Sequence, residues 1–486
     1  MNTAQSIFNN TGSQTEVVSK NIANVGNANY VKRTAILGTT MYGANIVSNG
    51  RSQDESLLRQ TIASSSLFSG QQTLLTGLEE VKSIYGGNDY EAAPAIYLAE
   101  LLKSIEAYAG KPSDAALAAT VVNSAVDVAS SLSKSSTELQ AMRTRADKEI
   151  VLQVDALNGM LARFETANNA VKTATALGTD PSNALDERET LLKDISSIVG
   201  LSVVTRPNND VALYTSDGTT LFETVPRKVS FEPQIGYDAT TTGNAIYIDG
   251  VVVKAGVGSN TTAVGSLAGL IQLRDDIIPT MQSQLDEIAR GVITMFAEKP
   301  FDPASGLPDV PGLFTWGSPA ETTLPADGVI TPGLAASIAV SSKVIIAQDG
   351  KPELLRDGGI NGDDYIWNDS TKGSTGYSTL IGKYIEAFST TMVFDDATRI
   401  DADTTILNYA TNSMGWLEQE RKGATDANEV KSALYERSNT AYSNNTAVSL
   451  DEELSLLLDI EQSYKAATKL VSTIDEMLEA LLSSVR

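Results

Sequence analysis

A proline-free stretch at residues 113–180 constrains the fold more than any other feature of the sequence. Apolar residues recur there every three or four positions, first from Leu117 to Leu132 and then from Leu139 to Phe164. This spacing places apolar side chains along one face of a helix. At 1.5 Å per residue, it predicts one helix, or two in series, approaching about 90 Å in length. Because a single globular core seldom needs so long a helix, the pattern predicts a rod or a bundle.

The C-terminal segment, residues 449–485, carries a second helical pattern with the spacing of a coiled coil. Its apolar positions alternate in steps of three and four, as in a heptad repeat, and charged or polar residues lie between them. The members of this seam are Leu457, Ile460, Tyr464, Ala467, Val471, Ile474, Leu478 and Leu481. Ser449, with Glu452 three residues later, predicts a capping box at the start of the helix. Since an apolar seam must be buried, we expect it to contact the other end of the chain and other copies of the protein.

The N-terminal residues show a weaker stripe of the same kind. Apolar or semi-apolar residues again follow one another in steps of three and four, and two of them, Thr11 and Thr15, are threonines. We therefore expect weak pairing with the C-terminal helix in a monomer, and ends that become ordered on assembly. The N-terminal part of the candidate assembly interface consists of Ile7, Val18, Ile22, Val25 and Tyr30.

The composition disfavours several classes of function. The chain has no cysteine and no histidine, which excludes disulfides, cysteine nucleophiles, histidine-based triads and the common zinc sites. Sixty acidic and 36 basic residues give a net charge of −24, so neither nucleic acid nor a membrane surface is an expected partner. No apolar run is long enough to predict a transmembrane helix, and no Sec signal is visible. We expect no catalytic residue, no cofactor and no metal site.

Two segments interrupt the helical pattern. Residues 201–261 hold short β-branched runs separated by Asn-Asn-Asp and Asp-Gly turns, which predict a small antiparallel β domain. Residues 300–380 are rich in proline, glycine and aspartate and predict an irregular outer insertion. Further helices are predicted at 186–199, 267–296 and 404–420.

The predicted fold is therefore mostly α with β insertions, in four parts. Residues 1–35 and 440–486 form a terminal coiled-coil assembly domain, and residues 36–200, 262–299 and 381–439 form a long helical bundle. The inserted small β domain spans 201–261, and the irregular Pro/Gly-rich insertion spans 300–380.

Three short motifs match ligand-binding patterns only in part. The segment from Gly256 to Asn260 lacks the Lys-Ser/Thr end of a phosphate loop, so a plain turn is favoured. The segment from Asp357 to Asn368 starts like a calcium loop but lacks the final bidentate glutamate. The acid pairs at 363–364 and 395–396 are best explained as surface groups in a chain of this charge.

The two ends resemble the family of flagellar rod, hook and hook-associated proteins. The segment NIANVGNANY (21–30) is similar to the N-terminal signature of the family and matches it at Ser19, Asn21, Ile22, Ala23, Asn24 and Tyr30. In place of the usual Thr-Pro-Gly stand Asn27, Ala28 and Asn29, and asparagine tolerates the left-handed conformation of a turn. The C-terminal signature is matched by Leu450, Glu452, Glu453, Leu457, Gln462, Tyr464, Ala466, Ala467, Ile474, Asp475, Glu476, Met477, Leu478 and Leu481.

The interior resembles the hook-associated branch of that family. Segments 180–204 and 265–289 are similar to two of its helices, and hook protein lacks such helices. The matching residues are Asp186, Arg188, Leu191, Gly269, Leu270, Arg274, Asp275 and Pro279.

The resemblance implies a structural, non-enzymatic protein where the hook meets the filament. Its terminal helices would form an inner coiled-coil layer, the long helices an outer bundle and the β insertions the outer surface. The implied partners are other copies of the chain, flagellar hook protein, the third hook-associated protein and a cytoplasmic export chaperone. The implied location is the extracellular flagellum, after type III export without a cleaved signal peptide. The alternatives are a hook protein or flagellin-like subunit and, from another class, a secreted enzyme or adhesin with its chemistry in 300–380.

Overall fold

The proline-free stretch forms one continuous helix, α4 (Ala115–Leu177), in the computed structural model, which describes residues 2–40, 43–368 and 373–484. Asp114 caps its start by accepting a hydrogen bond from the Ala116 amide at 3.0 Å. Gly178 ends it in the left-handed conformation, with φ of 67°. With 63 residues the helix is about 95 Å long. One window of α4 is apolar enough to cross a membrane by composition, but α4 is a core helix of the bundle, and 44% of that window is buried.

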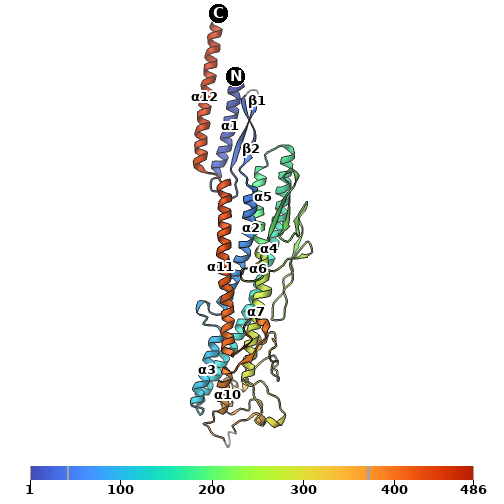
Figure 1. Ribbon diagram of the computed structural model, residues 1–486, viewed down its shortest axis with the longest axis vertical. Helices are drawn as coiled ribbons and strands as arrows, with labels where there is room; N and C mark the ends of the chain where they lie inside the picture. The colour runs from blue at the N-terminus through green and yellow to red at the C-terminus, as the bar shows by residue number, and fades with distance from the viewer. Residues whose placement is uncertain (1, 41–42, 369–372, 485–486) are drawn as a thin grey trace.

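Around α4 lies a bundle that runs along most of the rod (Figure 1). Its members are α2 (Glu55–Ile84), α3 (Pro94–Gly110), α5 (Ser182–Ile198), α6 (Ser266–Gln272), α7 (Ile278–Met295), α10 (Thr379–Ser389) and α11 (Ile406–Thr446). The helix predicted at 267–296 is present, with a π-helical segment, Leu273–Ile277, between α6 and α7. Its buried Arg274 pairs with Asp147 of α4 at 2.7 Å.

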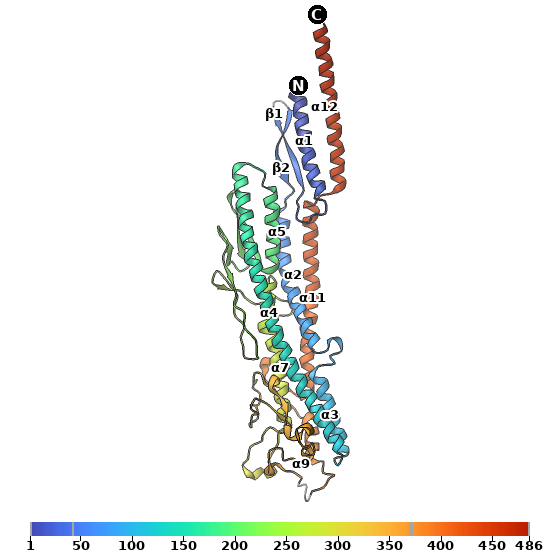
Figure 2. The same cartoon turned by 180° about the vertical axis from the view of Figure 1, so that it is seen from behind.

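The helix predicted at 404–420 is much longer than expected, because α11 continues to Thr446. Residues 421–446 are mostly polar, so no apolar stripe marks them in the sequence. They lie along α2 in both views (Figures 1 and 2), and the buried small residues Ala424, Ala427 and Ser438 permit this close packing.

The β region at 201–261 lies against the flank of α4 and α5 (Figure 2). It consists of two three-stranded antiparallel sheets, in the orders β3–β4–β5 and β6–β7–β8. The strands are β3 (Leu201–Thr205), β4 (Val211–Thr215), β5 (Thr220–Phe222), β6 (Val229–Ser230), β7 (Tyr247–Ile248) and β8 (Val251–Val252).

The described residues of the segment 300–380 are irregular and lie at the end of the rod far from both termini (Figure 1). It holds β9 (Phe314–Thr315), paired with β10 (Ala339–Val340), and two single-turn helices, α8 (Leu334–Ser337) and α9 (Leu354–Asp357). A last short pair, β11 (Met392–Val393) with β12 (Asp403–Thr404), precedes α11.

Both ends of the chain lie at the other extremity of the rod (Figures 1 and 2). Here α1 (Asn2–Ala23) packs along α12 (Leu450–Ser484), and an antiparallel hairpin of β1 (Arg33–Thr40) and β2 (Gly43–Arg51) packs on α1. We refer to these four elements as the terminal unit. The sequence did not predict the hairpin: residues from 36 onward were expected to belong to the helical bundle, which instead begins with α2 at Glu55.

Candidate assembly interface

The contact between α1 and α12 uses the first half of the C-terminal seam. Ile460 and Ala467 are buried, and the ring of Phe8 meets that of Tyr464 edge-on at 5.2 Å. The Glu452 amide donates to the Ser449 hydroxyl at 3.5 Å, while the Glu452 carboxylate pairs with Lys32 at 2.6 Å and does not close the capping box. The seam thus provides an intramolecular interface between the two chain ends.

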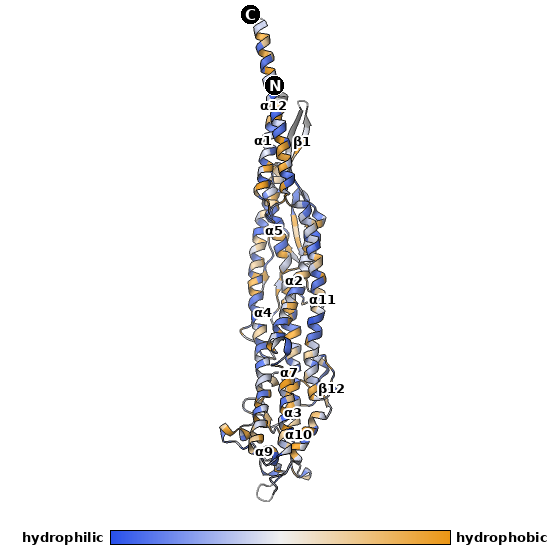
Figure 3. Ribbon diagram, turned by 90° about the vertical axis from the view of Figure 1, so that its left-hand side faces the viewer, coloured by the Kyte–Doolittle hydropathy of each residue, from blue (hydrophilic) through white to orange (hydrophobic). Residues whose placement is uncertain are grey.

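Within the described residues, the end of the seam beyond Ile474 is exposed. The 35-residue α12 is longer than the 22-residue α1 and extends past the N-terminus (Figure 3). Leu478 and Leu481 are 44% and 63% exposed, whereas Val471 and Ile474 are half-buried. Other exposed apolar residues on this part of α12 are Leu470, Met477 and Leu482.

The predicted N-terminal residues divide between the surface and the interior. Ile7 and Ile22 are half-buried and Val25 is exposed, so these three are accessible to a neighbour. Val18 and Tyr30 are buried inside the terminal unit instead. Both were expected at an interface between copies, and in this chain they hold α1 against its own neighbouring segments.

Asn21 fixes the chain reversal that follows α1. Its side-chain amide donates to the Arg33 carbonyl at 2.8 Å, and its oxygen accepts from the Tyr30 hydroxyl at 2.8 Å and the Arg33 amide at 3.1 Å. Gly26 takes the left-handed conformation of the turn, with φ of 82°. The expectation that Asn27 or Asn29 supplies that conformation is wrong, because neither has a positive φ, and Asn27 instead accepts a hydrogen bond from the Asn29 amide.

A buried charge network, which we call the joint, connects the terminal unit to the bundle. Arg51 of β2 binds Asp186 and Glu189 of α5, each at 2.6 Å, and Arg33 of β1 binds Asp186 at 3.0 Å. Tyr442 of α11 donates its hydroxyl to Glu189 at 2.6 Å, which together with burial raises the pKa of that tyrosine. The pKa of Arg51 is raised by its two carboxylate partners against the opposing effect of burial. Sequence reasoning missed the joint, because its members are far apart in the chain.

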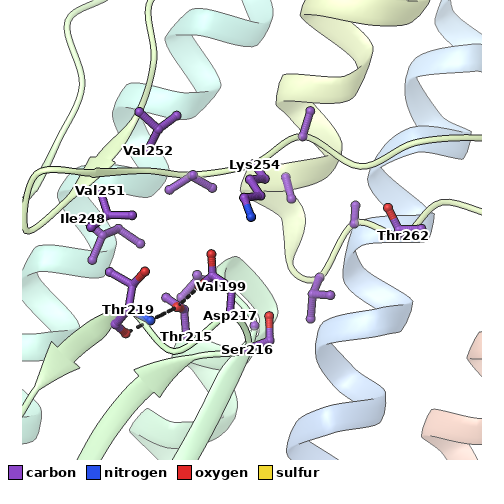
Figure 4. Close-up of a pocket in the computed structure, with 16 residues that line it drawn as sticks. Val199, Thr215, Ser216, Asp217, Thr219, Ile248, Val251, Val252, Lys254 and Thr262 are labelled. Carbon is purple, nitrogen blue, oxygen red and sulfur yellow. Dashed lines mark hydrogen bonds between the residues drawn. The ribbon is translucent and has the colours of Figure 1, made fainter.

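The weak ligand motifs form no metal site in the described residues, where no cluster of acidic groups has the geometry to hold an ion. In the calcium-like loop, the Asp357 carboxylate is already bound by Arg356 at 2.7 Å and by the Asn368 amide at 2.5 Å. Figure 4 shows a cleft between the β region and the segment before α6, into which the Lys254 side chain extends. It lacks the acidic pair or triad that a hydrolytic site would need.

Comparisons with known proteins agree with this architecture. Residues 78–299 match the model of the flagellar hook-associated protein FlgK helical domain, and residues 440–484 match that of the flagellar basal body rod FlgEFG protein C-terminal. Flagellar hook-associated protein 1 of Bacillus subtilis is 24% identical over 74% of this chain and 69% of its own length.

The Escherichia coli protein of the same name is 20% identical over 60% of this chain and 54% of its own length. In sequence, this chain is similar to flagellar hook-associated protein 1. The hook-associated protein 1 fold is also that of a solved structure, the flagellar hook junction protein FlgK from Burkholderia pseudomallei. That structure aligns with a TM-score of 0.57 and 12% identity, over 79% of this chain and 99% of its own. These similarities support a flagellar structural role for the chain.

Proposed function

We propose that this protein joins the flagellar hook to the filament by assembling with copies of itself and with the subunits on either side. The observation that carries the proposal is the free second half of the α12 seam. Its last two residues, Leu478 and Leu481, are apolar, helical and exposed, while Val471 and Ile474 before them are half-buried. Exposed apolar surface of this kind gains free energy only when a neighbour covers it.

The family supports the choice of neighbours. Flagellar hook protein on one side, the third hook-associated protein on the other and an export chaperone in the cytoplasm are the partners we propose, at the extracellular flagellum. We propose no catalytic activity, since the acid pairs at 363–364 and 395–396 form no cleft-bound dyad: Asp363 and Asp364 are exposed, and Asp395 caps a single turn by accepting from the Ala397 amide at 2.9 Å.

A deletion strain tests the proposal. Electron microscopy should find hooks without filaments, and flagellin should accumulate in the medium. Re-expression of the intact chain is the control and should restore filaments. Normal filaments on the deletion strain would overturn the junction assignment, and filament loss combined with missing hooks would place the protein earlier in assembly.

A further inference from the structure

A cleft of about 360 Å³ lies between the C-terminal end of α7 and α10, towards the end of the rod far from both termini (Figure 1). Its wall is mostly apolar and includes Met295 of α7, Leu380, Tyr384 and Ala387 of α10, Met392 of β11 and Trp367. A concave, mostly apolar surface of this volume, with a few polar groups, is typical of a small-molecule site.

The apolar wall of the cleft is accessible to solvent. Met295, Met392 and Trp367 are only half-buried, and a methionine side chain is flexible and polarisable, so it adapts to the shape of a ligand. The indole N–H of Trp367 already donates to the Lys299 carbonyl at 3.0 Å, and the exposed Phe301 meets the indole ring edge-on at 5.8 Å. Apolar surface that water contacts gains free energy when an apolar molecule covers it.

Lys383 is an exposed cation in the wall of this cleft. Its ammonium group lies over the Trp367 ring, 3.8 Å from the centroid, and no carboxylate of the described residues is within ion-pair distance of it. The other lysine of the wall, Lys299, is 3.4 Å from Asp309 and is therefore already paired. One exposed carboxylate, that of Glu386, also lines the cleft. The unpaired ammonium group favours an anion, and Glu386 disfavours an anion with more than one negative charge.

We propose that this cleft binds a small apolar monocarboxylate of the medium-chain fatty acid class. The alkyl chain would lie against Met295, Met392 and Trp367, and the carboxylate would pair with the Lys383 ammonium group. The volume is near the lower limit of ligand sites, about 300 Å³, which favours a short chain. The inference goes beyond the proposed function, since the cleft and the α12 seam lie towards opposite ends of the rod (Figure 1).

The test is a titration of the full chain, labelled with ¹³C-methyl methionine, with sodium octanoate at neutral pH and constant ionic strength, below the concentration at which octanoate forms micelles. The methyl resonances of Met295 and Met392, assigned by their loss in Met295→Leu and Met392→Leu, should shift and saturate. Met160 is the internal control. It is half-buried on α4, packs against apolar residues of α5 and the β region, and should keep its chemical shift.

Lys383→Gln should weaken octanoate binding by about fivefold, because the carboxylate then has no charged partner. Octanol has the same chain without the charge. It should bind wild type about fivefold more weakly than octanoate does, and Lys383→Gln should leave octanol binding unchanged. Lys148→Gln removes an exposed lysine of α4 and is the matched control, with unchanged affinity for octanoate. Ala387→Leu fills the cleft and should abolish the shifts.

Three results would overturn the site: shifts that stay linear in octanoate, shifts that Met160 shares, or shifts that Ala387→Leu leaves unchanged. Equal affinities of the wild-type chain for octanoate and octanol would overturn the assignment to a carboxylate. The wild-type titrations decide both points even if a variant fails to fold.

Discussion

Asn21 shows how one side chain determines the path of a whole segment. A primary amide both donates and accepts, and Asn21 uses both functions to hold Tyr30 and the backbone of Arg33. An aspartate cannot donate to the Arg33 carbonyl, and a leucine can do neither. This requirement gives a physical reason for asparagine at this point of the N-terminal signature.

Asn21→Ala should loosen the turn between α1 and β1. The change leaves the Arg33 amide and carbonyl without their buried partner, at a cost of about 1–3 kcal/mol for each unsatisfied group. Hydrogen exchange of residues 24–33 should accelerate while that of α4 stays unchanged. Asn24→Ala is the control, since the Asn24 side chain donates to the Lys20 carbonyl and accepts from the Asn27 side chain, and neither bond involves Tyr30 or Arg33. Equal exchange in both variants would contradict the role of Asn21.

Glu418 of α11 should make the stability of the folded bundle depend on pH. Hydrogen bonding to Arg421, with further contacts from Tyr90 and Lys82, lowers the pKa of this carboxyl to about 2. The carboxylate therefore stabilises the folded protein at pH values above the ordinary glutamate pKa of about 4.3. This contribution is lost as the pH falls towards 2. Between pH 5 and pH 3, the melting temperature of wild type should fall more than that of Glu418→Gln. Glu429→Gln, at an exposed position of the same helix, should behave like wild type.

At the scale of elements, the first half of α12 packs on α1 within the monomer, and the second half ends in an exposed segment, which we call the free half. Leu478→Asp places a charge in the free half, so the monomer should melt within about 0.5 kcal/mol of wild type. Incorporation should be lost, because burial of an unpaired carboxylate in an assembled seam costs several kcal/mol. Complementation of the deletion strain provides the measurement. Ser472→Asp puts the same charge on the polar face of α12 and should still give filaments.

The elements that the sequence predicted are those whose apolar spacing is regular. The length of α4, the helical C-terminus and the β region at 201–261 all follow from local patterns. The second part of α11 carries no such pattern, because contacts between small side chains and α2 stabilise it. The β1–β2 hairpin lacks clean alternation, with Ile36 and Leu37 adjacent and both half-exposed at a register shift. The joint was unpredictable for another reason: Arg51 and Glu189 are 138 positions apart.

At the scale of the whole molecule, the joint decides whether the terminal unit and the bundle behave as one body. Arg51→Met should destabilise the protein by about 3–5 kcal/mol, because Asp186 and Glu189 then remain buried without their main cation. Urea unfolding followed by circular dichroism measures the loss. Arg163→Met removes an exposed ion pair with Glu187 and should cost no more than about 1 kcal/mol. Similar midpoints for the two variants would show that the joint contributes little.

The terminal unit meets the bundle at two chain crossings, one leading into α2 and the other leaving α11. Hydrogen bonds tie the crossings together, from the Lys32 amide to the Thr446 carbonyl at 2.8 Å and from the Ser52 amide to the Lys32 carbonyl at 2.9 Å. If a single chain segment connected the two parts, they could rotate against each other, since rotation about the bonds of one segment meets little resistance. Two connecting segments that lie side by side together resist rotation of the terminal unit against the bundle. We therefore expect torque applied to the terminal helices to turn the rod as a whole.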